Sequence, residues 1–205
     1  MAADHMASSF YGSVKAPSDK LFIKPDLRFY ERRNELYPLS LISSTSSKRH
    51  TVVTAPTGAG KTDFLLRRCK GRVFYTLPFQ ASINAMYDRI KKDLSGTDAQ
   101  VYLLHSASNL KLKGGKTEEI IMQRHVGASV KVMTPHQMAS VAFGIKGYEA
   151  MALDLAGCDV ILDEIHTYSD TIQAIVLKIV EILVALNCRV HIGTATMPST
   201  LYSRI

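Results

Sequence analysis

Residues 55–62 read APTGAGKT and combine glycines with a lysine and a hydroxyl side chain. Glycine lets the backbone curl so that successive N–H groups face the oxygens of one phosphate, and the positive end of a following helix adds to the attraction. In such a loop Lys61 reaches the β- and γ-phosphates, and the Thr62 hydroxyl binds Mg²⁺. The residues expected to cradle the phosphates are Thr57, Gly58, Ala59 and Gly60. The segment therefore predicts a nucleoside triphosphate site, although a glycine-rich turn with an incidental lysine is the alternative.

A second candidate cluster, Asp163 and Glu164 with His166, follows the apolar run 160–162. At the end of a strand beside a phosphate-binding loop, Asp163 is placed to hold Mg²⁺ through water, while Glu164 aligns or deprotonates the attacking water. His166 then joins two carboxylates at one phosphate. Taken alone, the pair is better read as a polar strand terminus that caps the next helix. The upstream loop favours the catalytic interpretation, in which Lys61, Asp163, Glu164 and His166 act together.

The elements that must position these residues alternate between short β-branched runs and longer amphipathic segments, which predicts parallel strands with crossover helices. The predicted strands cover residues 51–55, 72–77, 100–104, 129–133, 159–162 and 189–193. The predicted helices cover 61–69, 80–94, 117–125, 135–143 and 148–155, and an apolar three- and four-residue repeat predicts another over 172–183. We expect an α/β fold of six or seven strands, mainly parallel, with helices on both faces.

Composition limits the class of protein. The chain has 205 residues and 46% apolar content, enough for one globular domain with a core, so disorder as the main state is excluded. The formal net charge of +7 favours a polyanionic partner without identifying it. Three separated cysteines suggest neither a disulfide framework nor a zinc site and favour a reducing cytoplasm. The longest apolar stretch, 174–188, is too short and too charged to cross a membrane.

The two clusters together resemble the DExH helicases of superfamily 2, and three more motifs of that family occur in the required order. They read LPFQAS at 77–82, VMTPHQ at 132–137 and GTATMP at 193–198. The resemblance implies that ATP and Mg²⁺ bind at the first cluster and that Thr194 and Thr196 couple the ATP state to nucleic acid. It also implies backbone contacts to a single strand from Pro78, Gln80, Thr134, His136 and Gln137. Each of the three motifs alone is more simply a helix-starting turn or a strand end.

Within that superfamily the flanking strings are most similar to the helicase part of the CRISPR-associated helicase-nuclease of type I systems, which degrades invader DNA. This resemblance implies a RecA-like P-loop NTPase domain over 48–205, after an expression-tag remnant at 1–9 and a helical segment and linker at 10–47. The implied partners are single-stranded DNA, a second RecA-like domain, an HD nuclease domain and a Cascade-type CRISPR effector complex. A DExH RNA helicase, a restriction-type DNA translocase and a non-catalytic nucleic-acid-binding module remain the alternatives.

Several residues depart from the family pattern or leave their role open. The segment 29–34 lacks the glutamine that recognises adenine in many relatives, so Tyr30, Arg32 or Arg33 is expected to substitute. No His-Asp pair occurs in the chain, so we expect the nuclease to lie elsewhere. The basic run 67–72 reads as a solvated helix end rather than a DNA contact.

We predict that this chain alone binds nucleotide, hydrolyses ATP slowly or not at all, and unwinds no duplex. The resemblance implies that ATP lies between two RecA-like domains, and the sequence ends at Ile205, directly after the coupling motif. An arginine supplied by a partner is worth roughly a thousandfold or more in phosphoryl-transfer enzymes. Steady-state ATPase and strand-displacement assays on the purified chain check this, and robust ATP-driven unwinding would contradict it.

Overall fold

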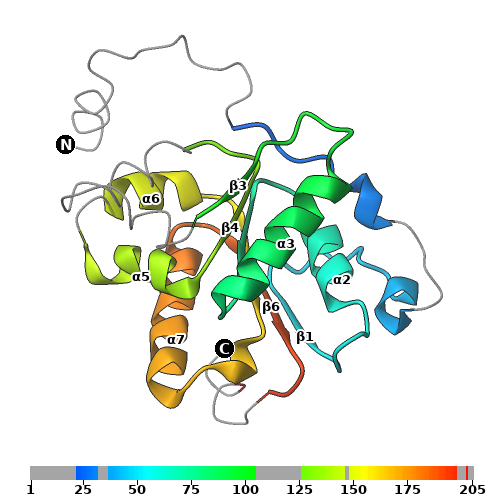
Figure 1. The fold of residues 1–205 in the computed structure, drawn as a ribbon. Helices are drawn as coiled ribbons and strands as arrows, with labels where there is room; N and C mark the ends of the chain where they lie inside the picture. Colours follow the sequence, from blue (N-terminus) through cyan, green and yellow to red (C-terminus); the bar gives the residue numbers. More distant parts are fainter. Residues whose placement is uncertain (1–21, 32–36, 105–125, 146–147, 198–201, 203–205) are drawn as a thin grey trace, which may run out of the picture.

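The computed structural model describes residues 22–31, 37–104, 126–145, 148–197 and 202, and within them it contains one six-stranded sheet in which every strand pair is parallel (Figure 1). The strands are β1 (Thr51–Thr54), β2 (Val73–Thr76), β3 (Val101–Leu103), β4 (Val130–Met133), β5 (Asp159–Asp163) and β6 (Arg189–Thr194). Their spatial order is β1-β6-β5-β2-β4-β3. The predicted α/β class, a mainly parallel sheet of the RecA-like kind, is confirmed.

Helices cover both faces of the sheet, as predicted, because strand side chains alternate between the two faces (Figure 1). They are α2 (Lys61–Arg68), α3 (Gln80–Asp93), α5 (Pro135–Phe143), α6 (Tyr148–Leu155) and α7 (Asp170–Ala185). Tyr75 and Ile161 belong to a core with α2 and α3, whereas Phe74 and Val160 belong to a second core with α5, α6 and α7. All four of these core side chains are fully buried, so β2 and β5, in the middle of the sheet, must carry apolar side chains on both faces.

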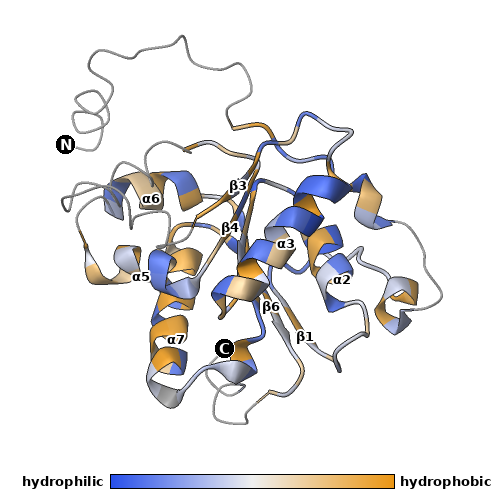
Figure 2. Cartoon of the chain, in the orientation of Figure 1, coloured by the Kyte–Doolittle hydropathy of each residue, from blue (hydrophilic) through white to orange (hydrophobic). Residues whose placement is uncertain are grey.

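The helices agree with their predicted bounds to within a few residues, and α5 and α6 match at both ends. Figure 2 shows that α7 is largely apolar, whereas α3 carries polar and apolar stripes, as its more exposed surface requires. The helix predicted over 117–125 lies outside the described residues. In the described part of the chain no helix is long and apolar enough to cross a bilayer.

The segment before β1 differs from the helical pattern that the sequence suggests. Its described residues form two 3-10 helices, η1 (Arg28–Glu31) and η2 (Pro38–Leu41). Pro38 cannot continue a preceding helix because it lacks the backbone N–H, and it begins a new turn instead. Arg67 anchors this turn, since its guanidinium donates to the carbonyls of Leu39 and Ser40 at 2.7 and 3.1 Å.

The prediction that the basic run 67–72 is a solvated helix end was wrong for its buried arginines. Arg68 is 5% exposed and donates to the backbone carbonyls of Ser44, Ser46 and Lys48, which fixes the linker before β1. Arg72 is 8% exposed and forms an ion pair with Asp154. Local sequence cannot reveal these partners, because they lie about 20 residues or more away along the chain.

A buried charge cluster connects Arg72, the residue before β2, with Lys131 on β4 and Asp154 on α6. Asp154 accepts hydrogen bonds from Arg72 and Lys131, and all three side chains are at most 9% exposed. Burial lowers the pKa of Lys131, and the ion pair with Asp154 opposes that shift. The backbone N–H of Gly127 donates to the same carboxylate at 2.9 Å. One carboxylate therefore compensates two buried cations.

Replacing Asp154 with asparagine is expected to destabilise the domain by about 3–5 kcal/mol, because it leaves two buried cations without a counter-charge. The free energy of unfolding, measured by urea denaturation, checks this value. The matched control is Asp88→Asn on the exposed surface of α3, where we expect a change within about 0.5 kcal/mol. Equal unfolding midpoints for the two variants would show that the Asp154 cluster contributes no net stability.

Candidate functional site

The phosphate-binding loop predicted at 55–62 connects β1 to α2, as the motif requires. Gly58 and Gly60 have φ angles of 84° and 86°, which is the left-handed region that favours glycine. Gly60 is the residue immediately before α2, so the first free N–H groups of the helix face the loop. Ala59 is the exception among the predicted cradle residues, because it is 6% exposed and its N–H donates to the carbonyl of Pro56 at 3.2 Å.

Lys61 lies folded over the loop that precedes it. Its Nζ donates to the carbonyl oxygens of Ala55 and Pro56 at 2.8 and 3.2 Å, and it lies 3.9 Å from Oε1 of Glu164. The side chain is only 6% exposed, so its charge is directed into the site and not into solvent. Two carbonyls are modest partners for an ammonium group, which leaves Lys61 able to exchange them for phosphate oxygens.

The two predicted metal ligands, Thr62 and Asp163, are brought together by a residue that the sequence does not mark. The Tyr75 hydroxyl on β2 donates to Oδ2 of Asp163 at 2.5 Å and lies 3.5 Å from Oγ1 of Thr62. Burial raises the pKa of Asp163, which the Tyr75 hydroxyl opposes, and burial raises the pKa of Tyr75 well above its usual value. Tyr75 therefore stays protonated and acts as a donor.

Glu164 and His166 connect this cluster to the coupling motif on β6. Glu164 has a φ of 58°, which turns the chain sharply at the end of β5 into the 3-10 helix η4 (Ile165–Thr167). Nδ1 of His166 lies 3.3 Å from Oε2 of Glu164 and 3.1 Å from Oγ1 of Thr194. The Thr194 hydroxyl donates to the carbonyl of Thr196 at 2.5 Å, and the backbone N–H of Ala195 lies 3.4 Å from the same Nδ1, so the imidazole contacts two residues of the coupling motif.

The strand order places a further strand between the phosphate-binding loop and the acidic pair. The ends of β1 and β5 are not adjacent, because β6 lies between them. Gly193 on β6 pairs with Val53 on one side and with Asp163 on the other. A Cβ at Gly193 would lie 2.6 Å from Oδ1 of Asp163 and 2.8 Å from Cδ1 of Leu65. The Asp163 carboxylate thus occupies space that exists only because the intervening strand carries a glycine.

A cavity of about 460 Å³ opens over the loop. Its walls include all of the predicted nucleotide residues except Ala59 and His166, namely Thr57, Gly58, Gly60, Lys61, Thr62, Asp163 and Glu164. Three further lining residues, Tyr37, Asp63 and Arg89, were missed by sequence reasoning. Asp63 directly follows the motif and could have been suspected, but Arg89 comes from α3 and pairs with Asp63 only through the tertiary fold.

The residues expected to replace the adenine-binding glutamine do not line the cavity in the described part of the chain. Tyr30 is 1% exposed and packs in the core with α2 and α3, so it is not available to a nucleotide. Arg32 and Arg33 lie outside the described residues. Tyr37 instead reaches the cavity, because the N–H of Leu39 donates to the carbonyl of Ala59 at 3.1 Å and docks η2 on the loop.

The residues predicted to contact nucleic acid follow β2 and β4, on the same edge of the sheet as the cavity. Gln80 and His136 are exposed, and Pro78 and Thr134 are half-buried. Gln137 has a structural task, since its Oε1 accepts from the N–H of Thr134 at 3.0 Å and completes a capping box for α5. Strand contact by these five residues stays a prediction.

The oxygen donors fit a magnesium ion. Thr62 offers a hydroxyl and Asp163 a carboxylate, which are the hard ligands that Mg²⁺ prefers in combination with phosphate oxygens. The adjacent glycine-bordered cavity and the buried Lys61 fit the phosphates themselves. The arrangement can therefore hold a triphosphate with Glu164 at its far end.

Comparison with known proteins decides the family. The model of the DEAD/DEAH box helicase family matches residues 39–203, which is most of the chain. The chain belongs to this family. The match includes the phosphate-binding loop, the Asp163–Glu164 pair and the coupling motif, all of which meet at one edge of the sheet.

The resemblance to a CRISPR-associated helicase-nuclease is also confirmed. The chain is 27% identical over 175 residues to the CRISPR-associated nuclease/helicase Cas3 of Methanothermobacter thermautotrophicus, covering 79% of this chain and 21% of that protein. The crystal structure of T. fusca Cas3 superposes with a TM-score of 0.72 at 19% identity, over 90% of this chain and 23% of that one. The structure titled T. fusca Cas3-ATP has the same TM-score at 20% identity and the same coverage. The chain thus spans about a quarter or less of these relatives.

Gly193→Ala is expected to weaken binding of Mg²⁺ and nucleotide several-fold and to lower stability by about 1–3 kcal/mol, because the new methyl group displaces the Asp163 carboxylate or Leu65. Titration with a fluorescent ATP analogue, with and without Mg²⁺, measures the effect. Gly96→Ala is the matched control, since a Cβ there meets no atom within 4 Å. Unchanged Mg²⁺-dependent affinity in Gly193→Ala would refute the packing argument.

Proposed function

We propose that this chain is the ATP-binding first RecA-like domain of an ATP-dependent DNA helicase or translocase that acts in CRISPR interference. The observation that carries the proposal is the contact of Tyr75 with both Asp163 and Thr62, beside Lys61 and Glu164. Residues far apart in the sequence converge there as ATP hydrolysis requires. The similarity to Cas3 proteins supports the CRISPR setting.

Each residue has a role that its geometry supports. Backbone N–H groups of the loop and the start of α2 bind phosphate oxygens, and Lys61 leaves the carbonyls of Ala55 and Pro56 to reach the β- and γ-phosphates. Thr62 and Asp163 would hold Mg²⁺, which neutralises the charge that develops on the phosphates. Glu164, 29% exposed at the cavity, orients the attacking water and accepts its proton.

In this proposal His166 connects ATP hydrolysis to movement of the nucleic-acid strand. Its Nδ1 faces both Glu164 and Thr194, so a change at the γ-phosphate position that moves Glu164 also changes the partner of Thr194. Thr194 and Thr196 lie at the end of β6, between the strands that carry the phosphate-binding loop and the acidic pair. This position supports a coupling role for the two threonines.

Single-stranded DNA would lie across the ends of β2 and β4, beside the nucleotide site on the same sheet edge. Gln80 and Thr134 stand at the starts of α3 and α5, where free N–H groups and hydroxyls suit contacts to phosphates. Such contacts position a strand without reading its sequence. The proposal further includes a second RecA-like domain that supplies an arginine, an HD nuclease domain, a Cascade-type effector complex and a cytoplasmic location.

Two other functions differ from this proposal in measurable ways. A DExH RNA helicase or a restriction-type translocase would use the same residues, but RNA or duplex DNA would stimulate hydrolysis. A non-catalytic nucleic-acid-binding module would not need an ordered acidic pair. The contacts among Lys61, Tyr75, Asp163 and Glu164 favour a working nucleotide site over a decayed one.

Lys61→Ala is expected to weaken binding of an ATP analogue by this chain at least about tenfold, since the lysine supplies the cation for the β- and γ-phosphates. Fluorescence titration in the presence of Mg²⁺ measures this, with Lys178→Ala on the exposed surface of α7 as the control. In a longer chain that includes the second RecA-like domain, single-stranded DNA should stimulate ATP hydrolysis, and Lys61→Ala should abolish the stimulation. Equal stimulated rates with and without Lys61 would exclude the proposed function.

A further inference from the structure

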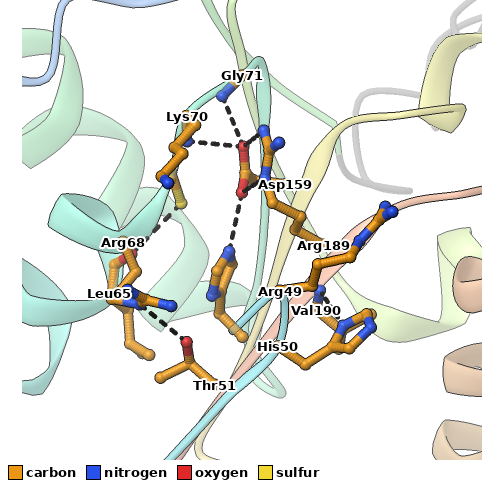
Figure 3. A network of polar contacts seen from close by, with 12 residues as sticks. Arg49, His50, Thr51, Leu65, Arg68, Lys70, Gly71, Asp159, Arg189 and Val190 are labelled. Atoms are coloured by element: carbon orange, nitrogen blue, oxygen red, sulfur yellow. Dashed lines mark hydrogen bonds and ion pairs between the residues drawn. The ribbon is translucent and has the colours of Figure 1, made fainter. Parts of the chain in front are cut away.

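A basic pocket lies at the opposite edge of the sheet from the nucleotide cavity. Figure 3 shows four of its cationic residues, Arg49, Arg68, Lys70 and Arg189, around Asp159. It has a volume of about 310 Å³, which is at the lower end of the roughly 300–1,000 Å³ typical of ligand sites. Its cationic lining residues are Lys48, Arg49, Arg68, Lys70 and Arg189. They come from segments that precede β1, β2 and β6 or begin β6, so the pocket is formed by the amino ends of the strands. The nucleotide motifs all follow the carboxyl ends.

Asp159 is the carboxylate that pairs with a cation of this pocket within the described part of the chain, and its oxygens are already satisfied from within the fold. Its oxygens accept two hydrogen bonds from Arg189, at 2.8 and 2.7 Å, and one from Nε2 of His191 at 2.8 Å. The backbone N–H groups of Lys70 and Gly71 donate at 2.9 and 2.6 Å. These hydrogen bonds hold the pKa of Asp159 well below its usual value despite burial. Asp159 therefore neutralises Arg189 and has no capacity left for the other cations.

The same network excludes a metal ion as the ligand. Ligand atoms of Cys69, Asp159 and His191 lie within 4.8 Å of one another, which would suit a small cation by distance alone. An ion there would have to compete with the five hydrogen bonds that the Asp159 oxygens already accept. Burial also raises the pKa of the Cys69 thiol well above its usual value, so the thiolate that a metal needs is disfavoured. The cluster is a structural network.

Four cations around the pocket consequently lack a carboxylate partner within the part of the chain that the structure describes. Arg68 donates to backbone carbonyls and to the Thr51 hydroxyl, and Arg49 donates to the carbonyl of Asn187. Lys48 and Lys70 are exposed, and their ammonium groups have no side-chain or backbone partner among the described residues. Like charges that line one pocket repel each other, and a bound anion would offset that repulsion.

We propose that this pocket is a second phosphate-binding site, which takes a phosphodiester of a nucleic-acid strand at the edge of the domain away from the ATP site. Besides the five cations, its lining consists of a serine, a glycine and an asparagine. Basic, small polar and glycine residues are the types that contact phosphate oxygens in nucleic-acid complexes.

The lining also argues against the other polyanion that a basic pocket could take, an acidic peptide. Peptide recognition relies on apolar anchors in pockets or on an exposed strand edge, and no apolar or aromatic side chain lines this pocket. The absence of aromatic lining residues further predicts that bases do not stack here, so binding is independent of sequence. The ligand is the backbone of the strand.

The test measures binding of a fluorescein-labelled 20-nucleotide oligothymidine to the purified chain by anisotropy over a range of salt concentrations. All proteins carry Lys61→Ala, which weakens phosphate binding at the ATP loop. Adding Lys48→Gln and Lys70→Gln should lower the affinity at low salt at least about fivefold and reduce the salt slope by about 1.4, since each lost phosphate contact to a single strand removes about 0.7.

The matched control replaces Lys92 on α3 and Lys178 on α7 with glutamine, which removes the same charge from exposed helix surfaces. Its salt slope should stay unchanged. Thermal unfolding midpoints within about 3 °C of the parent protein confirm that each variant is folded. If the pocket variant and the control bind the oligonucleotide equally at every salt concentration, a nucleic-acid strand is not the ligand.

A second titration, with inorganic pyrophosphate and detected by calorimetry, separates the two sources of phosphate. Weaker binding of both ligands by the pocket variant supports the proposal for a strand. Weaker binding of pyrophosphate alone supports a phosphate site that small anions fill, and corrects the source of the phosphate. No difference from the control with either ligand overturns the phosphate site altogether.

Discussion

All six strands run in one direction, and the rest of the structure depends on this constraint. A parallel sheet places every carboxyl end at one edge, so motifs separated by up to 140 residues become neighbours. Along that edge the order β1-β6-β5-β2-β4-β3 puts the phosphate-binding loop, the coupling motif and the acidic pair side by side. The segments predicted to contact nucleic acid follow at β2 and β4. Strand order thus separates the nucleotide motifs from the segments that are predicted to contact nucleic acid.

The nucleotide motifs are held together by a buried carboxylate in an apolar sheet. Asp163 is 3% exposed, and burial without compensation would be unfavourable for its charged form. Tyr75 and the backbone N–H of Glu164 donate to its oxygens, and Gly193 leaves the space that it occupies. Three different strands therefore contribute to holding one predicted metal ligand. The same environment that orders the group also leaves it poorly solvated and available to a cation.

The opposite edge of the sheet has a different electrostatic organisation. Asp154 and Asp159 are each buried and each compensate cations from neighbouring strands, namely Lys131 and Arg72 in one case and Arg189 in the other. Both carboxylates are neutralised by these buried ion pairs, so the surface above Asp159 remains basic. The net charge of +7 is consequently not spread evenly, since part of it gathers at the amino ends of β1 and β6.

Sequence by itself determined the elements and their chemistry. The periodicity of apolar residues located all six strands, and the spacing of glycine, lysine and threonine identified the phosphate loop, because local backbone geometry and residue type are sufficient for both. Only the tertiary structure decided which strands are neighbours, which is why β6 between β1 and β5 and the need for Gly193 were not foreseen. It also showed that Tyr75 contacts the two predicted metal ligands and that Arg68 binds the linker. These partners are set by strand order and packing between distant segments, and single-sequence patterns carry no record of such contacts.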